Sequence, residues 1–315
     1  MQNPVPSKFS FEVLIDDSFS NFSSDDLEPV ENKNVLSLIN DFEDGSWRYS
    51  KFQNFIWDNI AETALSFRER ESLANQSHSS LVAAAKNLRL TDKDKKDIGK
   101  GSELAEILLY GVMKHHYNSL PIVPKIFYKQ NAQDNAKGSD SVHIVIENED
   151  SFSLWLGESK FYDSIADDRL DSIVQSVFNA LQKDKLKKEN SIITSVSDLE
   201  NFVKNSKLLE NIRDLLSNDN SIDDLKPFLH IPILLLHECP LTKSCRSLSQ
   251  DYKDSIIKYH KERAEAYFRK QITKLKDVIF KYSEITFHII LFPVPDKSEI
   301  VDRFISNVEH YKGQG

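Results

Sequence analysis

An aspartate and a Glu-x-Lys pair are the residues whose types and spacing best suit joint chemistry. Glu158 and Lys160 are two positions apart, so both side chains leave the same face if this segment is a strand. The runs 142–147 and 152–161 are rich in strand-forming residues, and the polar residues between them predict a hairpin. If the hairpin folds about its midpoint, Asp140 lies directly opposite Glu158. Two carboxylates and an ammonium group would then converge at one edge of a sheet.

This grouping suits the hydrolysis of a phosphodiester. The carboxylate oxygens of Asp140 and Glu158 are the hard ligands that Mg²⁺ prefers, and Mg²⁺ keeps several waters while it accepts a phosphate oxygen. The metal lowers the pKa of a bound water and neutralises the charge that develops on phosphorus. Lys160 beside it could orient or deprotonate that water, or stabilise the oxyanion.

A solvated ion pair on the surface of a sheet is the alternative interpretation of these three residues. Along the first expected strand, the apolar residues at 142 and 144 leave the same face as Asp140. Along the second, those at 154 and 156 leave the same face as Glu158 and Lys160. The charged groups therefore end a row of side chains that should face the core. Burying such charges is costly unless they are paired or bound to a metal, so the pattern favours a functional site.

The composition is that of an ordinary globular protein. The chain has 315 residues, of which 40% are hydrophobic and 28% are charged, with only 8 Gly and 10 Pro. No apolar run approaches the roughly 20 residues that cross a bilayer, and the amino terminus lacks a signal-peptide pattern. Cys239 and Cys245 are too few and too isolated for a disulfide scaffold or a zinc site. We therefore expect a cytoplasmic protein with no membrane association.

The net charge of −9 is unevenly distributed. Residues 1–45 hold ten acids against two lysines, a net of −8, so the rest of the chain carries about −1. Lysines cluster at 183–188, after the expected motif, so a polyanionic partner is not excluded. We expect the acidic segment to restrain activity or to dock a partner, and the alternative is a solvated terminus that aids solubility. No nucleotide-binding loop is present.

The elements that must position the charged residues follow from hydrophobic periodicity. Before a charged boundary at 89–101 we expect a strand at 9–15 and helices at 34–42, 52–71 and 77–88. After it we expect helices at 102–117, 165–186, 197–216, 251–280 and from 296, with strands at 124–129, 231–236 and 285–292 besides the hairpin. This order predicts an α/β fold in which helices flank a mixed central sheet. We expect two domains, an acidic and mostly helical N-terminal region at 1–95 and a second domain at 96–315.

Asp140 followed by Glu158-x-Lys160 on the next strand, and then by a helix, resembles the PD-(D/E)xK nuclease superfamily with its restriction-endonuclease-like core. Glu103, in Gly-Ser-Glu-Leu-Ala-Glu, matches the acidic residue that many members carry on the helix before the hairpin. More narrowly, the segments Gly-Lys-Gly-Ser-Glu, Lys-Gly-Ser-Asp and Leu-Trp-Leu-Gly-Glu-Ser-Lys-Phe-Tyr resemble the HamA family, the nuclease subunits of the Hachiman anti-phage defence system. The resemblance covers roughly residues 100–294.

The resemblance implies a role for each matching residue. Asp140 and Glu158 would be metal ligands, the backbone carbonyl of Ser159 a further ligand, and Glu103 an auxiliary ligand, directly or through water. Lys160 would activate water or stabilise charge. The implied cofactor is Mg²⁺, for which Mn²⁺ can substitute, and the implied partners are DNA and a helicase subunit similar to HamB in a hetero-complex. The alternative is a non-catalytic subunit that binds DNA or a partner through a degenerate nuclease fold.

The sequence departs from the superfamily pattern in two places. Ser139 replaces the Pro of the superfamily name, which many members also lack. Gln175 matches a glutamine of the exonuclease-like members, but Asn179 stands where those members have Tyr. An exonuclease that requires a DNA end is therefore not indicated.

Overall fold

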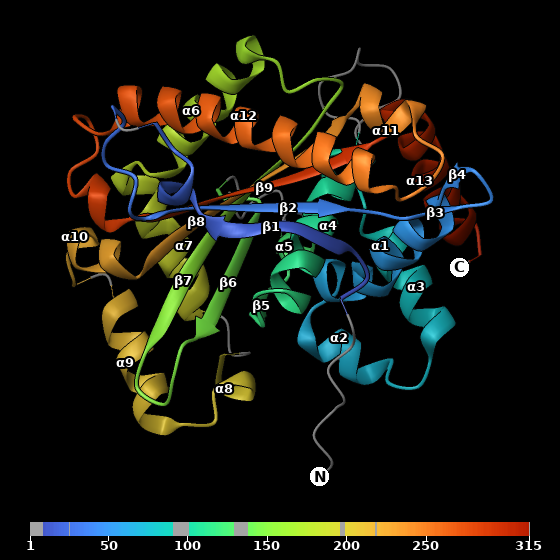
Figure 1. The fold of residues 1–315 in the computed structure, drawn as a ribbon. Coiled ribbons are helices and arrows are strands. Elements are labelled where there is room, and N and C mark those ends of the chain that lie inside the picture. The colour runs from blue at the N-terminus through green and yellow to red at the C-terminus, as the bar shows by residue number, and fades with distance from the viewer. Residues whose placement is uncertain are drawn as a thin grey trace.

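A seven-stranded mixed sheet runs through the molecule in this computed structural model (Figure 1). The structure describes residues 9–24, 26–90, 101–128, 138–195, 199–217 and 219–314. The strand order is β1-β2-β9-β8-β7-β6-β5, and β3 and β4 form a separate two-stranded sheet. The strands are β1 (Glu12–Ser18), β2 (Lys33–Ile39), β3 (Phe42–Glu43), β4 (Ser46–Trp47), β5 (Leu120–Val123), β6 (Ser141–Ile146), β7 (Phe152–Tyr162), β8 (Leu229–Glu238) and β9 (Thr286–Val294).

The centre of the sheet is parallel and apolar on both faces. Strands β2, β9, β8 and β7 run parallel to one another, whereas β1, β6 and β5 pair antiparallel at the two sides. Along β8, Ile233 and Leu235 belong to one hydrophobic core, and Leu234 and Leu236 belong to the other. A strand covered on both faces needs such a continuous apolar run, which explains the sequence of β8.

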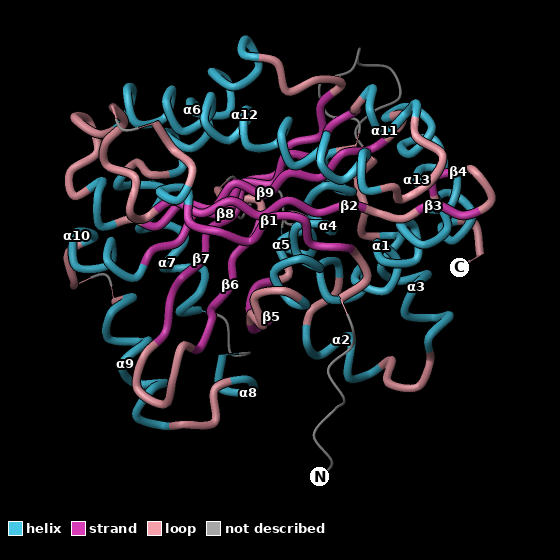
Figure 2. Tube along the Cα trace, in the orientation of Figure 1, coloured by secondary structure: helices cyan, strands magenta, loops and turns pink. Residues whose placement is uncertain are grey.

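Helices cover both faces of this sheet (Figures 1 and 2). The core on one face takes side chains from α6 (Asp167–Ala180), α7 (Lys183–Ser195), α9 (Ser206–Leu216) and α12 (Gln250–Leu275). The core on the other face takes them from α1 (Tyr49–Ala64), α3 (Ser77–Lys86), α4 (Ser102–His115) and α13 (Lys297–Lys312). Shorter helices are α2 (Phe67–Ser72), α5 (Lys125–Tyr128), α8 (Leu199–Phe202), α10 (Ile222–Leu225) and α11 (Pro240–Ser244), with 3-10 turns η1 (Phe19–Asn21), η2 (Lys226–Phe228) and η3 (Tyr282–Glu284). The expected α/β architecture with a mixed central sheet is confirmed.

Several expected elements are wrong in type or extent. The helix expected at 34–42 is strand β2, because it gains burial from β1 and β9 on either side. The strand expected at 124–129 is instead β5 followed by the short helix α5. The helix expected at 165–186 ends at Ala180, and α7 begins at Lys183; the helix expected at 197–216 corresponds to α8 and α9. Propensity and periodicity yield to tertiary packing in these segments.

The N-terminal region shares the central sheet. Residues 9–90 contribute four strands as well as three helices, and β1 and β2 lie in the same sheet as the hairpin. Helix α1 packs closely on α4, since a Cβ atom at Gly111 would lie 2.5 Å from the ring of Phe55. The domain boundary expected at 95/96 falls outside the described residues, so the division stays a prediction. In the described part of the chain, no helix has both the length and the apolar character that crossing a bilayer requires.

Candidate active site

The register of the β6–β7 hairpin brings Asp140 and Glu158 together. Ser141 pairs with Gly157 at the start of β6, and Asp140, just before that strand, donates its N–H to the Gly157 carbonyl at 2.8 Å, so Asp140 lies beside the 157–159 segment of β7. The midpoint predicted for the hairpin is confirmed for the pairs from Ser141–Gly157 to Ile146–Phe152, whereas the directly opposed pair predicted for Asp140 and Glu158 is not among the paired residues. A Cβ atom at Gly157 would lie 2.2 Å from the Ser141 hydroxyl and 2.8 Å from a methyl of Leu109, so only glycine lets α4 approach the hairpin this closely.

Lys160 joins the two carboxylates. Its Nζ lies 3.2 Å from Glu158 Oε2 and 3.8 Å from Asp140 Oδ2, so both acids converge on one positive charge. The backbone N–H and the hydroxyl of Ser159 donate to Asp140 Oδ2 at 3.0 and 3.3 Å. We call Asp140, Glu158 and Lys160 the hairpin cluster.

The hairpin cluster is largely withdrawn from solvent. Glu158 is only 7% exposed, and it ends the row of Leu154 and Leu156 that faces the core. Burial by itself would lower the pKa of Lys160, but the charges of Asp140 and Glu158 outweigh it, so the pKa lies above its ordinary value. A solvated ion pair on the surface would leave its side chains exposed, so that interpretation does not fit these three residues.

The structure does not bring Glu103 into the hairpin cluster. Its two carboxylate oxygens accept the backbone N–H groups of Arg89 and Leu90 at 2.8 and 3.0 Å. Another acidic residue of α4, Glu106, lies where Glu103 was expected: it is buried and lines a small cavity together with Asp140. The cavity holds about 10 Å³, enough for about one water molecule. The sequence signal for Glu106 was present, because it lies one helical turn after Glu103.

Other residues from the superfamily comparison lie elsewhere. Gln175 donates to Asn179 at 3.1 Å on the exposed face of α6, which is the ordinary behaviour of polar residues one turn apart. Ser139, at the position of the superfamily Pro, is buried, and its N–H donates to Glu189 at 2.8 Å. The sequence reasoning missed Glu189, because it belongs to no motif.

The donor set of the hairpin cluster fits a hard divalent cation. Across the described ranges, no three His, Cys, Asp or Glu side chains converge to hold a metal ion. Two carboxylates beside the backbone of Ser159 nevertheless match Mg²⁺, which binds through one or two protein carboxylates and completes its shell with water and substrate phosphate. Glu106 lies close enough to line the same cavity as Asp140.

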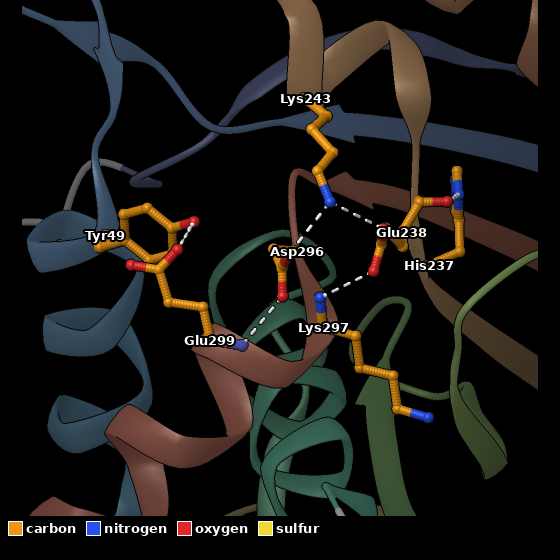
Figure 3. A network of polar contacts seen from close by, with 7 residues as sticks. All are labelled: Tyr49, His237, Glu238, Lys243, Asp296, Lys297 and Glu299. Carbon is orange, nitrogen blue, oxygen red and sulfur yellow. Dashed lines mark hydrogen bonds and ion pairs between the residues drawn. The ribbon is translucent and has the colours of Figure 1, made fainter.

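A second group of charged residues lies at the carboxyl ends of β8 and β9 (Figure 3). Lys243 lies 3.4 Å from Glu238 and 3.1 Å from Asp296, and we call these three residues the capping cluster. Glu238 also accepts the backbone N–H of Lys297 at 3.2 Å, and Asp296 accepts that of Glu299 at 3.0 Å. These bonds satisfy N–H groups of the first turn of α13, so the cluster acts as a helix cap.

His237 is the residue before Glu238 in β8, and its side chain points away from the capping cluster (Figure 3). Its Nε2 lies 3.2 Å from Nε2 of His260, whose Nδ1 lies 2.7 Å from the Ser37 hydroxyl. Burial lowers the pKa of His237 to about 4, so the ring is neutral at physiological pH. These contacts tie β8 to α12 and β2 within the fold.

Comparison with protein-family models matches residues 16–308 to HamA. The match covers the hairpin cluster, α4 and the strands of the central sheet, beginning at Asp16 within β1. A search of curated proteins finds no match. The family match therefore extends beyond residues 100–294, over which the sequence motifs indicated the resemblance.

Proposed function

The chain belongs to the HamA family, and we propose that it is a metal-dependent DNA nuclease, the effector subunit of a helicase–nuclease complex in Hachiman anti-phage defence. Family membership supports a role in the Hachiman system. The observation that carries the nuclease is the convergence of Asp140, Glu158 and Lys160 at the end of a core-facing row. A cytoplasmic location belongs to the same proposal.

In this proposal the chain positions a phosphodiester against a divalent cation. Asp140 and Glu158 would hold Mg²⁺, and the Ser159 carbonyl would be a further ligand. Bound Mg²⁺ would supply positive charge for the phosphate and lower the pKa of water. The ammonium group of Lys160 faces the same point as the carboxylates, where it orients the attacking water or stabilises the negative charge that develops on phosphate.

The proposal includes a restriction-endonuclease-like core for residues 96–315. Its support is the order of elements around the site: helix α4, the β6–β7 hairpin with the charged motif, helix α6 and the parallel strand β8. Glu106 takes the place that we expected for Glu103, since it is the acid of α4 that shares a cavity with Asp140.

The proposed partner is a helicase subunit. The sequence contains no nucleotide-binding loop, so coupling to ATP must come from another chain. Such coupling would let cleavage wait until a particular DNA structure is recognised. An unrestrained nuclease would damage the DNA of its own cell.

The deciding experiment is DNA cleavage by the purified full-length chain, with and without its helicase partner and ATP. We expect cleavage with Mg²⁺ and none with EDTA, and a faster reaction in the complex than in the isolated chain. If the complex binds DNA but never cuts it, the non-catalytic alternative is correct. If the isolated chain degrades plasmid as fast as the complex, restraint by the partner is wrong.

A further inference from the structure

A buried ion pair contacts the short segment that precedes Asp140. Lys125 of α5 and Glu189 of α7 are 4% and 1% exposed, and Lys125 Nζ lies 2.6 Å from Glu189 Oε2. Burying two charges carries a large desolvation cost, so such a pair is weak grounds for a stabilising role. Its contacts with the loop before β6 point to a different role.

The second oxygen of Glu189 binds the backbone beside Asp140. Glu189 Oε1 accepts the N–H of Ser139 at 2.8 Å. A Cβ atom at Gly138 would lie 1.6 Å from the same oxygen, so the chain at 138–139 lies directly against the carboxylate, and a larger residue there would have to displace it. Lys125 fixes one oxygen of Glu189, and the other oxygen fixes the residue next to Asp140.

Asp140 is therefore held from two sides. From β7, the Gly157 carbonyl accepts the Asp140 N–H and Ser159 donates to the Asp140 carboxylate. From α7, Glu189 holds the preceding residue. The contacts with β7 come from the hairpin itself, whereas Glu189 lies 50 residues beyond Ser139 in the chain.

We propose that Glu189, oriented by Lys125, is a positioning residue that fixes the Gly138–Asp140 segment so that Asp140 meets Glu158 and Lys160. It touches neither metal nor DNA in this role. The inference rests on the proposed metal centre for its functional consequence, but its structural part stands on the hydrogen bond to Ser139. Residues that orient ligands in this way typically change metal affinity or activity by about 10- to 100-fold when they are replaced.

Two matched double variants separate positioning from stability. Lys125→Met with Glu189→Gln removes both charges and keeps an oxygen that can accept the Ser139 N–H. Lys125→Met with Glu189→Leu removes both charges and the acceptor. Melting temperatures select conditions in which both are folded, and the probe is Mn²⁺ alone, with binding to the full-length chain measured by calorimetry. We expect the Gln variant to bind within about threefold of wild type and the Leu variant to bind about 10- to 100-fold more weakly.

Hydrogen–deuterium exchange of the peptide that contains residues 138–141 gives a second reading that needs no metal. We expect faster exchange in the Leu variant than in the Gln variant. Equal exchange and equal Mn²⁺ binding in the two would overturn the positioning role. If wild type itself binds no Mn²⁺, the proposed metal centre is wrong, and exchange alone then decides the inference.

Gly138→Ala serves as an independent variant if the Leu double variant does not fold. The added methyl must displace either the Glu189 carboxylate or the 138–139 backbone. We expect the same faster exchange at 138–141 and the same weaker Mn²⁺ binding, with Lys125 and Glu189 unchanged in sequence. Wild-type exchange and binding in this folded variant would contradict the proposal.

Discussion

The hairpin cluster and the capping cluster each place one lysine between two carboxylates, at distances between 3.1 and 3.8 Å, yet they differ in burial. The Lys243 side chain is 55% exposed, whereas that of Lys160 is 26% exposed. Glu158 is 10% exposed at its side chain, and Glu238 is 29% exposed. The same residue types at similar spacing therefore occupy two different environments.

The two clusters also differ in what their acids serve. In the capping cluster, Glu238 and Asp296 bind the first N–H groups of α13, so the acids complete a helix that would otherwise expose unpaired donors. In the hairpin cluster, Asp140 binds the backbone of the neighbouring strand, and the group lies beside a cavity that Glu106 also lines. The burial and the contacts of such a group of charges therefore indicate its role, whereas its residue types alone do not.

Replacing the lysine of each cluster in turn should give the largest difference between the clusters in DNA cleavage. We expect Lys160→Ala to reduce DNA cleavage about 10²- to 10⁴-fold, the usual range for a group that assists proton transfer or stabilises charge. Lys243→Ala, the matched control, should leave cleavage within about twofold. Its ion pairs are exposed and screened by solvent, so they contribute little to stability and its melting temperature should change little. Initial rates of plasmid cleavage at equal folded fraction provide the measurement.

Equal cleavage by Lys160→Ala and wild type would remove the functional distinction between the clusters. Glu158→Ala tests the same point through a ligand, and it should also abolish cleavage while DNA binding persists. A loss of cleavage in Lys243→Ala as large as that in Lys160→Ala would instead place the capping cluster in the active machinery.

A smaller effect should separate Glu106 from Glu103 on α4. We expect Glu106→Gln to lower cleavage about tenfold or more, because Glu106 shares the cavity with Asp140. Glu103→Gln should keep cleavage within about threefold and lose about 1 kcal/mol of stability, because its carboxylate accepts the N–H groups of Arg89 and Leu90. Cleavage rates and urea unfolding of both variants test this. The reverse order of effects would restore Glu103 as the auxiliary ligand.

The hairpin cluster was predictable because its determinants are local. Alternating apolar residues define two strands, a polar turn joins them, and the register follows from the midpoint of the turn. Three charged residues within about 20 positions then have only one arrangement. Glu106 was harder, because Glu103 and Glu106 lie one turn apart and the sequence does not show which of them the packing of α4 turns toward the hairpin.

The rest of the fold depends on contacts between distant parts of the chain. Strand β2 is a strand because Val35 pairs with Ile289 in β9, and no local pattern announces that partner. Glu189 meets Ser139 only after α7 has docked. Acids near the amino terminus also have partners that lie far away in the sequence. Glu12 pairs with Lys253, and Asp26 pairs with Arg269; both partners are on α12. Their expected role in restraint or docking stays a prediction.

The smallest expected effect concerns Asp296, the N-cap of α13. We expect Asp296→Ala to lose about 1 kcal/mol of stability at pH 7, the usual cost of removing such a cap, with cleavage unchanged. The hydrogen bond from the Glu299 N–H, followed by that from Lys243, holds the pKa of Asp296 below its ordinary value of 3.8. The folded state therefore favours the ionised carboxylate, so this contribution is fully present above about pH 4 and is lost as the pH falls through the lowered pKa.

The stability difference between wild type and Asp296→Ala should accordingly be constant from pH 7 to about 5 and should narrow below pH 4. Urea unfolding at several pH values measures it. Asp296→Asn is the control, because asparagine caps a helix about as well as aspartate and should stay within a few tenths of a kcal/mol of wild type at pH 7. A difference that persists unchanged below the lowered pKa would show that the carboxylate charge is not what supports the cap. A drop in cleavage in Asp296→Ala at unchanged folded fraction would show that the capping cluster, like the hairpin cluster, contributes to the reaction and does more than cap α13.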